Sequence, residues 1–316
     1  MAKLVSRLPA AARGDEQALR KCKELLDAVF RLVRSGDAER QSLSLLVLVA
    51  LFRVFFALDT PALGRNLVRT LLQPGFPALT EFPLGHLVAF RFFSGRLAML
   101  EDDAAAALAA LQFVYAALPR ADVKRRRLVY AYLAPVRMTL GWRPDEATLA
   151  ELELQSLSEA VRAVRAGKGR LFASILDTHR RRFVHHGSYL MLCAFGAAGT
   201  SGGRRLTTHF AGRLKLIASR QLLKASVKAL DGASKVSLQT VLPLFQKWDD
   251  FDDNEDALEQ LKGVVVNLVH HGLVRGYLSH EHGVLVLSAK EPFPRTALTL
   301  GGAAALESAA ANAAAE

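Results

Sequence analysis

Cysteine is scarce in this sequence: Cys22 and Cys193 are the only two among 316 residues. Two cysteines are too few for the disulfide framework that holds small secreted domains together. They are compatible with a reducing compartment, either the nucleus or the cytosol. The sequence therefore excludes the class of disulfide-stabilised extracellular domains.

Long apolar runs are also missing. The most apolar stretch, Leu45 to Leu58, is interrupted by Arg53 and is shorter than the roughly 20 residues that a membrane-spanning helix needs. The first residues carry Lys3, Arg7 and Arg13 but no apolar run that could serve as a secretory signal. We therefore expect a buried helix at Leu45 to Leu58, and neither membrane insertion nor export.

The signatures of nucleotide-using and hydrolytic enzymes are absent or out of context. Gly167-Lys168-Gly169 lacks the spacing with which a glycine-rich loop wraps phosphates. Residues Gly199 to Gly203 match the pattern Gly-x-Ser-x-Gly around Ser201. The preceding Tyr189 to Phe195, however, has the pattern of a helix end, whereas a nucleophile elbow requires a core strand there. We predict no catalytic residue, no cofactor and no small-molecule substrate.

The histidine pairs do not indicate a metal site. They are His185-His186, His270-His271 and the near neighbours His280 and His282. Structural zinc usually recruits cysteine, and neither cysteine stands beside these pairs. His270 and His271 fall in the last turn of an expected helix, where imidazoles interact favourably with the helix carbonyls. We therefore predict no metal.

Positive charge is abundant but unevenly distributed. The formal net charge is +11, and the segment from Arg120 to Lys235 contains 22 Lys and Arg against 8 Asp and Glu. The rest of the chain is slightly acidic. Such a basic segment suits a polyanion, although basic residues also solubilise exposed helix faces. The composition leaves three options open: a nucleic acid, an acidic protein partner, or solvation alone.

Helical periodicity dominates the chain before residue 270, and strand signals are nearly absent there. The expected helices lie near residues 16–34, 40–58, 61–72, 85–100, 104–118, 121–140, 145–166 and 168–195, with a further basic helical stretch over 205–230. Successive helix pairs of this size favour an α-solenoid of tetratricopeptide-like pairs, in which neighbours bury faces that no single pair could bury. The fold class is therefore mainly all-α.

A β-hairpin is predicted near the end of this helical pattern. Leu273 to Ser279 and Val284 to Ser288 are rich in β-prone residues, and His280 to Gly283 form a polar turn between them. Gly283 can adopt a positive φ there at no steric cost. A hairpin directly after a helix is the wing of a winged helix.

The helix before the wing has a clear start, face and stop. Leu258, Leu261, Val265 and Leu268 recur at helical spacing, and Gly272 follows them. Capping groups and negative charge are expected at the helix start from Asp253, Asn254, Glu255 and Asp256. We divide the chain into a helical-repeat region over 1–195, a glycine-rich loop at 196–204, a winged-helix region over 205–295 and a disordered alanine-rich tail over 296–316.

Two motifs carry a resemblance to a known family. Tyr132 to Gly141 (Tyr-Leu-Ala-Pro-Val-Arg-Met-Thr-Leu-Gly) resembles the segment Tyr-Leu-Ile-Pro-Val-Lys-Met-Leu-Leu-Gly of the messenger-RNA-export branch of the PCI-domain family. Gly276 to His282 (Gly-Tyr-Leu-Ser-His-Glu-His) is similar to the wing of that branch. Leu285 to Ser288 and Pro292 to Pro294 match its end, and a weaker likeness begins near residue 42. The order of helical array and winged helix is that of the PCI domain.

The resemblance implies a non-enzymatic subunit of a nuclear-pore-associated transcription-and-export complex. It implies a larger PCI scaffold subunit and a small, highly acidic protein as partners, and RNA or DNA bound through a basic surface around the winged helix. It places the protein in the nucleus at the nuclear pore and leaves room for a cytoplasmic fraction. The alternative is a scaffold of the same fold that binds only protein, as in proteasome-lid or signalosome assemblies.

We expect the nucleic-acid backbone to be bound without reading of base sequence. The predicted recognition helix carries only Lys262 as a basic residue, too little for base-edge contacts in the major groove. Lys and Arg contacts to phosphate give affinity without sequence preference. The predicted binding residues are Arg180, Arg181, Arg182, Arg204, Arg205, Arg213, Lys215, Arg220, Lys224, Lys262, Arg275 and Lys290.

Overall fold

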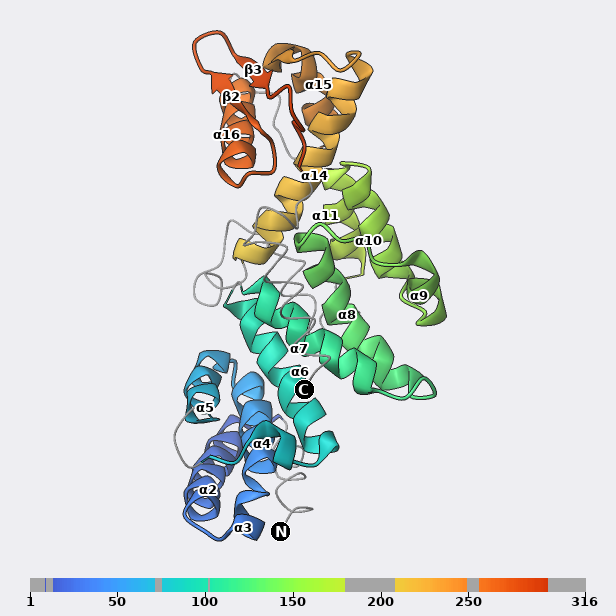
Figure 1. Cartoon of the computed structure of the whole chain (residues 1–316). Helices are drawn as coiled ribbons and strands as arrows, with labels where there is room; N and C mark the ends of the chain where they lie inside the picture. Colours follow the sequence, from blue (N-terminus) through green and yellow to red (C-terminus); the bar gives the residue numbers. More distant parts are fainter. Residues whose placement is uncertain are drawn as a thin grey trace. The chain divides into compact units, whose positions relative to one another are not determined.

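The computed structural model describes residues 14–71, 76–101, 103–179, 208–248 and 256–294, together with Pro9. These residues form two compact units, whose boundary in the sequence lies between Pro119 and Arg120. Both are mainly helical, and the second also contains a small antiparallel sheet (Figure 1). The predicted fold class, an α-solenoid followed by a winged helix, is confirmed.

The first unit is a succession of helices. It contains α2 (Glu16–Arg34), α3 (Ala38–Gln41), α4 (Ser44–Ala57), the 3-10 turn η1 (Pro61–Leu63), α5 (Gly64–Leu71), η2 (Leu79–Glu81), α6 (Leu84–Leu100) and α7 (Ala104–Ala117). Helix α4 packs against α2 on one side and α6 on the other, and α6 packs against α7. The apolar stretch predicted as a buried helix is α4, which needs apolar residues on nearly every face because it lies between two neighbours.

Helix α2 illustrates how local sequence determines these elements. The carboxylate of Asp15 accepts hydrogen bonds from the backbone N–H groups of Gln17 and Ala18, at 2.9 and 3.1 Å. Leu19, Cys22, Leu26 and Val33 then recur at helical spacing and are buried against α4. The cap fixes where the helix begins, and the apolar stripe fixes which face it buries.

The Cys22 thiol is expected to react only when the first unit opens. Its side chain is 4% exposed, and burial raises its pKa, which reduces the reactive thiolate further. In a Cys193→Ser variant of the full chain, modification of Cys22 by a chromogenic disulfide reagent should be at least about a hundredfold slower in buffer than in denaturant. Equal rates in the two conditions would show that Cys22 is accessible in the folded protein.

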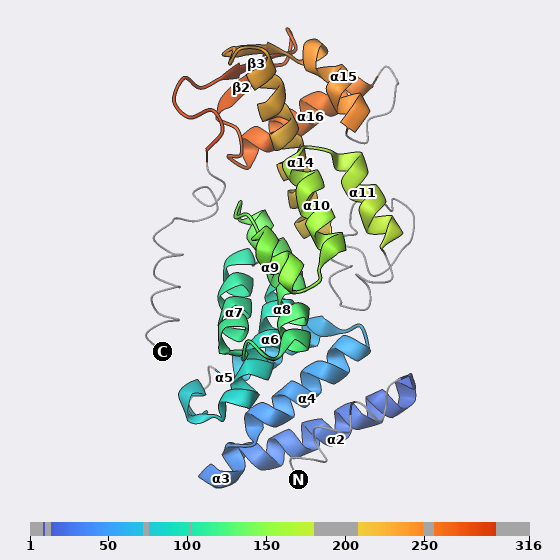
Figure 2. The ribbon, with the colours of Figure 1, turned by 90° about the vertical axis from the view of Figure 1, so that its right-hand side faces the viewer.

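The second unit consists of further helices followed by the winged helix. It contains α8 (Val123–Thr139), α9 (Glu146–Glu151), α10 (Gln155–Arg165), α11 (Gly169–Thr178), α14 (Thr208–Ala229), β1 (Lys235–Ser237), α15 (Leu238–Trp248), α16 (Ala257–His270), β2 (Gly276–Ser279) and β3 (Val284–Leu287). Helix α14 contacts α8, α10 and α11 as well as α15 and α16. The helix pairs and the winged helix therefore share α14, as Figures 1 and 2 show.

The winged-helix sheet has three strands in the order β1-β3-β2, with both pairings antiparallel. The predicted hairpin is β2 paired with β3, with Leu278 opposite Leu285. On the other side of β3, strand β1 pairs Val236 with Leu285. This strand was not predicted from the sequence. The buried core of this region includes Phe245 from α15 and Val265 from α16, together with Leu285.

Three predicted helices are wrong in extent. The helix predicted over 168–195 is α11, which ends at Thr178. The stretch 145–166 contains α9 and α10 because Glu153 has a φ of +52°, which stops the first helix. The Arg127 guanidinium stabilises this break, since its Nε donates to the Leu152 carbonyl at 2.7 Å and the same side chain is hydrogen-bonded to the Glu153 carboxylate. The stretch 40–58 begins with the separate helix α3 and continues as α4. The predicted limits at 195, 205 and 295, the glycine-rich loop and the tail lie outside the described residues.

No helix within the described part of the chain has the length and apolarity needed to span a membrane.

Candidate functional site

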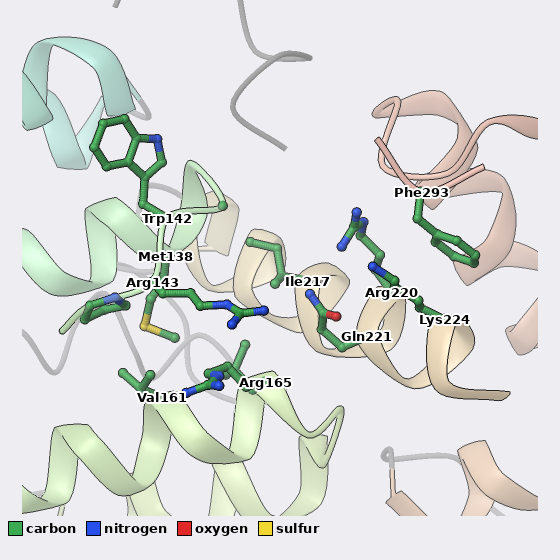
Figure 3. Close-up of a pocket in the computed structure, with 13 residues that line it drawn as sticks. Met138, Trp142, Arg143, Val161, Arg165, Ile217, Arg220, Gln221, Lys224 and Phe293 are labelled. Carbon is green, nitrogen blue, oxygen red and sulfur yellow. The ribbon is translucent and has the colours of Figure 1, made fainter. Parts of the chain in front are cut away.

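A pocket of about 800 Å³ opens in the second unit. It is bordered by the end of α8 and the residues that follow it, by α10, by α14 and by the segment after β3 (Figure 3). Its lining residues are Met138, Gly141, Trp142, Arg143, Pro144, Val161, Val164, Arg165, Ile217, Arg220, Gln221, Lys224 and Phe293. These described lining residues include four cations and two large aromatic side chains, and none of them is a carboxylate.

The turn after α8 positions Trp142 and Arg143. Gly141 has a φ of +78°, the left-handed conformation that closes many helices. The N–H of Gly141 donates to the Met138 carbonyl at 2.9 Å, and the N–H of Trp142 donates to the Arg137 carbonyl at 2.8 Å. These two bonds form a Schellman motif, which stops the helix and directs the next two side chains to the pocket. The motif residues Leu140-Gly141 therefore have a structural role at the edge of the pocket.

Helix α14 provides the opposite wall. Ile217, Arg220, Gln221 and Lys224 are three and four residues apart, a spacing that places them on one face of a helix. Lys224 is exposed, whereas Ile217 is 7% exposed and adds an apolar side chain to the lining. The wall changes from apolar to cationic along the helix.

Arg220 is a buried part of this wall, with 6% of its surface exposed. Its Nε donates to the Leu273 carbonyl at 2.9 Å and its Nη2 donates to the Pro294 carbonyl at 2.7 Å. The guanidinium carbon lies 5.9 Å from the centre of the Phe293 ring. Burial lowers the pKa of Arg220, but guanidinium stays protonated in proteins because its ordinary pKa is so high. Arg220 therefore fastens α14 to the winged helix and brings a positive charge close to the pocket.

Three other cations line the pocket. Arg165 pairs with Glu146, with Nη1 2.7 Å from Oε1. Arg143 and Lys224 are exposed and have no ion-pair partner within the described parts of the chain. Glu146 offsets the charge of Arg165, but the described lining residues include no carboxylate, so the lining keeps an excess of positive charge that suits an anion.

The structure places the predicted binding residues in several environments. Arg180, Arg181, Arg182, Arg204 and Arg205 lie outside the described residues, as does the side chain of Arg213. Lys215 is half-buried on α14. Among the predicted residues whose side chains the structure describes, Arg220 and Lys224 alone line the pocket.

The predicted residues of the winged helix lie apart from the pocket lining. Lys262 is largely neutralised by Glu259, with Nζ 2.7 Å from Oε1. The Lys262 ammonium also lowers the pKa of the Glu259 carboxyl, mainly through that hydrogen bond. Arg275 pairs with Glu291 at 3.1 Å, and Lys290 is exposed. None of these three cations lines the pocket.

Sequence reasoning missed Trp142, Arg143 and Arg165. The basic runs and clusters of the sequence lie elsewhere, whereas these side chains are isolated in the sequence and come together only through the fold. One signal was available: an aromatic and a basic residue directly after the glycine that ends a helix motif.

The sequence relatives agree with the winged-helix architecture. No family model matches the chain. The PCI domain-containing protein 2 homolog of Dictyostelium discoideum is 26% identical over 259 residues, covering 82% of this chain and 55% of that protein. PCI domain-containing protein 2 of Xenopus laevis is 28% identical over 283 residues, covering 87% of this chain and 64% of that protein. The chain belongs to the PCI-domain family.

Within the family, these relatives support assignment of the chain to the group of PCI domain-containing protein 2. The chain is also similar to the protein CSN12 homolog of Mycosarcoma maydis, with 26% identity over 302 residues that cover 90% of this chain and 62% of that protein. The chain spans 55 to 64% of the length of these three relatives.

Proposed function

We propose that this PCI-domain protein is a non-enzymatic scaffold subunit of a nuclear messenger-RNA export complex, and that it binds the backbone of RNA or DNA through a basic surface of its second unit. The similarity to PCI domain-containing protein 2 supports the scaffold role. The partners in this proposal are a larger PCI subunit and a small, highly acidic protein, and the location is the nuclear pore.

The observation that carries nucleic-acid binding is the pocket. It brings together Arg143, Arg165 and Lys224 from three separate elements with no carboxylate in the lining. Phosphate groups spaced along a chain suit such separated cations, because each cation contacts a different phosphate and releases counterions. Contacts from Lys and Arg to phosphate carry no sequence information, so the proposed binding is to backbone charge and does not depend on base sequence.

A second candidate is a scaffold that binds only protein. The similarity to a CSN12 homolog is the observation that favours it. Affinity purification of the full chain separates the two complexes: the export proposal expects the larger PCI subunit and the small acidic protein, whereas recovery of proteasome-lid or signalosome subunits favours the second candidate.

Charge reversal in the pocket is expected to weaken RNA binding and its salt dependence. In the variant Arg143→Glu/Lys224→Glu, two exposed cations become carboxylates at positions that make no ion pair within the described residues. Affinity for a single-stranded RNA should fall at least about tenfold near physiological salt, and the slope of log K against log salt should become shallower by roughly 1.4, about 0.7 per lost phosphate contact. Fluorescence anisotropy of a labelled RNA over a salt series measures both.

The matched control is Lys124→Glu/Lys235→Glu. It makes the same change in net charge at two exposed lysines, at the start of α8 and in β1, that do not line the pocket. The control should retain most of the affinity. An equal loss in both variants would show that net charge, and not the pocket, determines binding, while no loss in the pocket variant would assign binding to another surface.

A further inference from the structure

The pocket also has features that a phosphate-binding surface does not require. We infer that it accommodates an unpaired nucleotide, with the base stacked on Trp142 and the flanking phosphates bound by Arg143 and Lys224, so that the protein selects single-stranded over double-stranded nucleic acid. This inference rests on the proposed function and adds the strand class of its ligand.

The first observation is the exposure of Trp142. Its side chain is 45% exposed, although tryptophan is among the most strongly buried side chains on average. The Schellman turn at Gly141 holds the backbone of Trp142 in one conformation through its bond to the Arg137 carbonyl. An exposed indole on this defined backbone offers a flat π-face, on which any base can stack because every base has a π-face as well.

The second observation is the arrangement of charge around that ring. In Figure 3 the Trp142 ring lies at one end of the pocket and the Phe293 ring at the other, and Arg143, Gln221 and Lys224 lie between them. Alternation of aromatic rings with cations is what a single strand requires, because its bases and phosphates alternate along the chain. Gln221 adds an amide that can donate to or accept from a base edge.

The third observation is size. A volume of about 800 Å³ lies within the range of pockets that enclose small organic ligands. A base pair within a duplex has both its faces stacked, so a duplex can present only phosphates to the pocket opening, and Trp142 would gain nothing from it. An acidic peptide could neutralise Arg143 and Lys224, but its carboxylates would leave the indole face uncovered. The combination of ring and cations therefore favours a single strand.

The test compares strand classes in Trp142→Ala, with Trp142→Phe as the conservative variant. Anisotropy titrations of the full chain use a labelled single-stranded RNA, the same RNA annealed to its complement, and a labelled poly-glutamate peptide. Trp142→Ala should lose about tenfold in affinity for the single strand and less than twofold for the duplex. Trp142→Phe, which keeps an aromatic face, should recover most of the loss.

Tyr277→Ala is the matched control, since Tyr277 is an aromatic side chain of the wing that is 63% exposed and does not line the pocket. It should bind the single strand as the unaltered protein does. Equal losses for single strand and duplex in Trp142→Ala, no loss at all, or tighter Trp142-dependent binding of poly-glutamate would each overturn the inference. In the first two cases charge reversal at Arg143 and Lys224 still decides the proposed backbone binding, whereas an unaltered protein that binds neither form of RNA overturns both proposals.

Discussion

Arg220→Ala is expected to lower the free energy of unfolding of the second unit by about 4 kcal/mol. The substitution removes two charge-assisted hydrogen bonds and leaves the Leu273 and Pro294 carbonyls without these donors. A hydrogen bond from a charged group contributes roughly 1.5–3 kcal/mol, and a buried group left unpaired adds a cost of its own. Both tryptophan residues of the chain, Trp142 and Trp248, belong to the second unit. Urea unfolding followed by tryptophan fluorescence therefore reports on this unit specifically.

Two further variants distinguish the contribution of the two Arg220 hydrogen bonds to stability from that of its positive charge. Arg220→Lys keeps a cation but cannot reproduce the fork that reaches two carbonyls, so it should lose about half as much stability. Lys224→Ala lies one turn farther along the same helix at an exposed position and should change stability by less than roughly 0.5 kcal/mol. If Arg220→Ala were as stable as Lys224→Ala, the bridge between α14 and the winged helix would have no stabilising role.

Gly167→Ala is expected to cost about 3 kcal/mol or more. Gly167 follows α10 with a φ of +70°, and a Cβ there would stand 2.6 Å from the backbone nitrogen of Leu222 on α14. An alanine pays roughly 1–2 kcal/mol for the left-handed conformation, and it must also push two packed helices apart, which costs typically 1–3 kcal/mol more. The same urea titration measures the loss.

Gly263→Ala is expected to raise the free energy of unfolding, the opposite of the effect of Gly167→Ala. Gly263 lies inside α16, is exposed, and has nothing within 4 Å of the position that a Cβ would take. Alanine should stabilise the helix by up to about 1 kcal/mol because glycine is the poorer helix former. Equal effects of the two substitutions would contradict the close approach of α14 to Gly167.

The sequence predicted most helices because their signals are local. Asp15 caps α2, apolar residues recur at helical spacing, and Gly272 ends α16 with a φ of +66° and a bond from the Leu273 N–H to the Leu268 carbonyl. Asp256, expected to cap α16, is the N-cap residue but its side chain accepts no capping bond. Local patterns therefore gave the elements more reliably than the individual contacts at their ends.

Features that depend on distant residues were not predicted. Strand β1 has only three residues and exists because β3 offers it a free edge, with Leu238 N–H donating to the Gly283 carbonyl just beyond it. The helix break at Glu153 depends on Arg127, which is 26 residues earlier. The pocket is the extreme case, since Arg143, Arg165 and Lys224 share no sequence pattern. The basic runs visible in the sequence are segments such as Arg180 to Arg182, which lie outside the described residues.

Helix α14 belongs to two packing surfaces at once. Its buried residues include Leu214 and Ile217 toward one end and Leu223 and Val227 toward the other, and it contacts both α10 and α16. No cut in the polypeptide could separate the helix pairs from the winged helix without exposing one of these apolar faces to water. The helix pairs and the winged helix therefore form one folding unit. A substitution that disturbs packing on one side of α14 is expected to destabilise the other side as well.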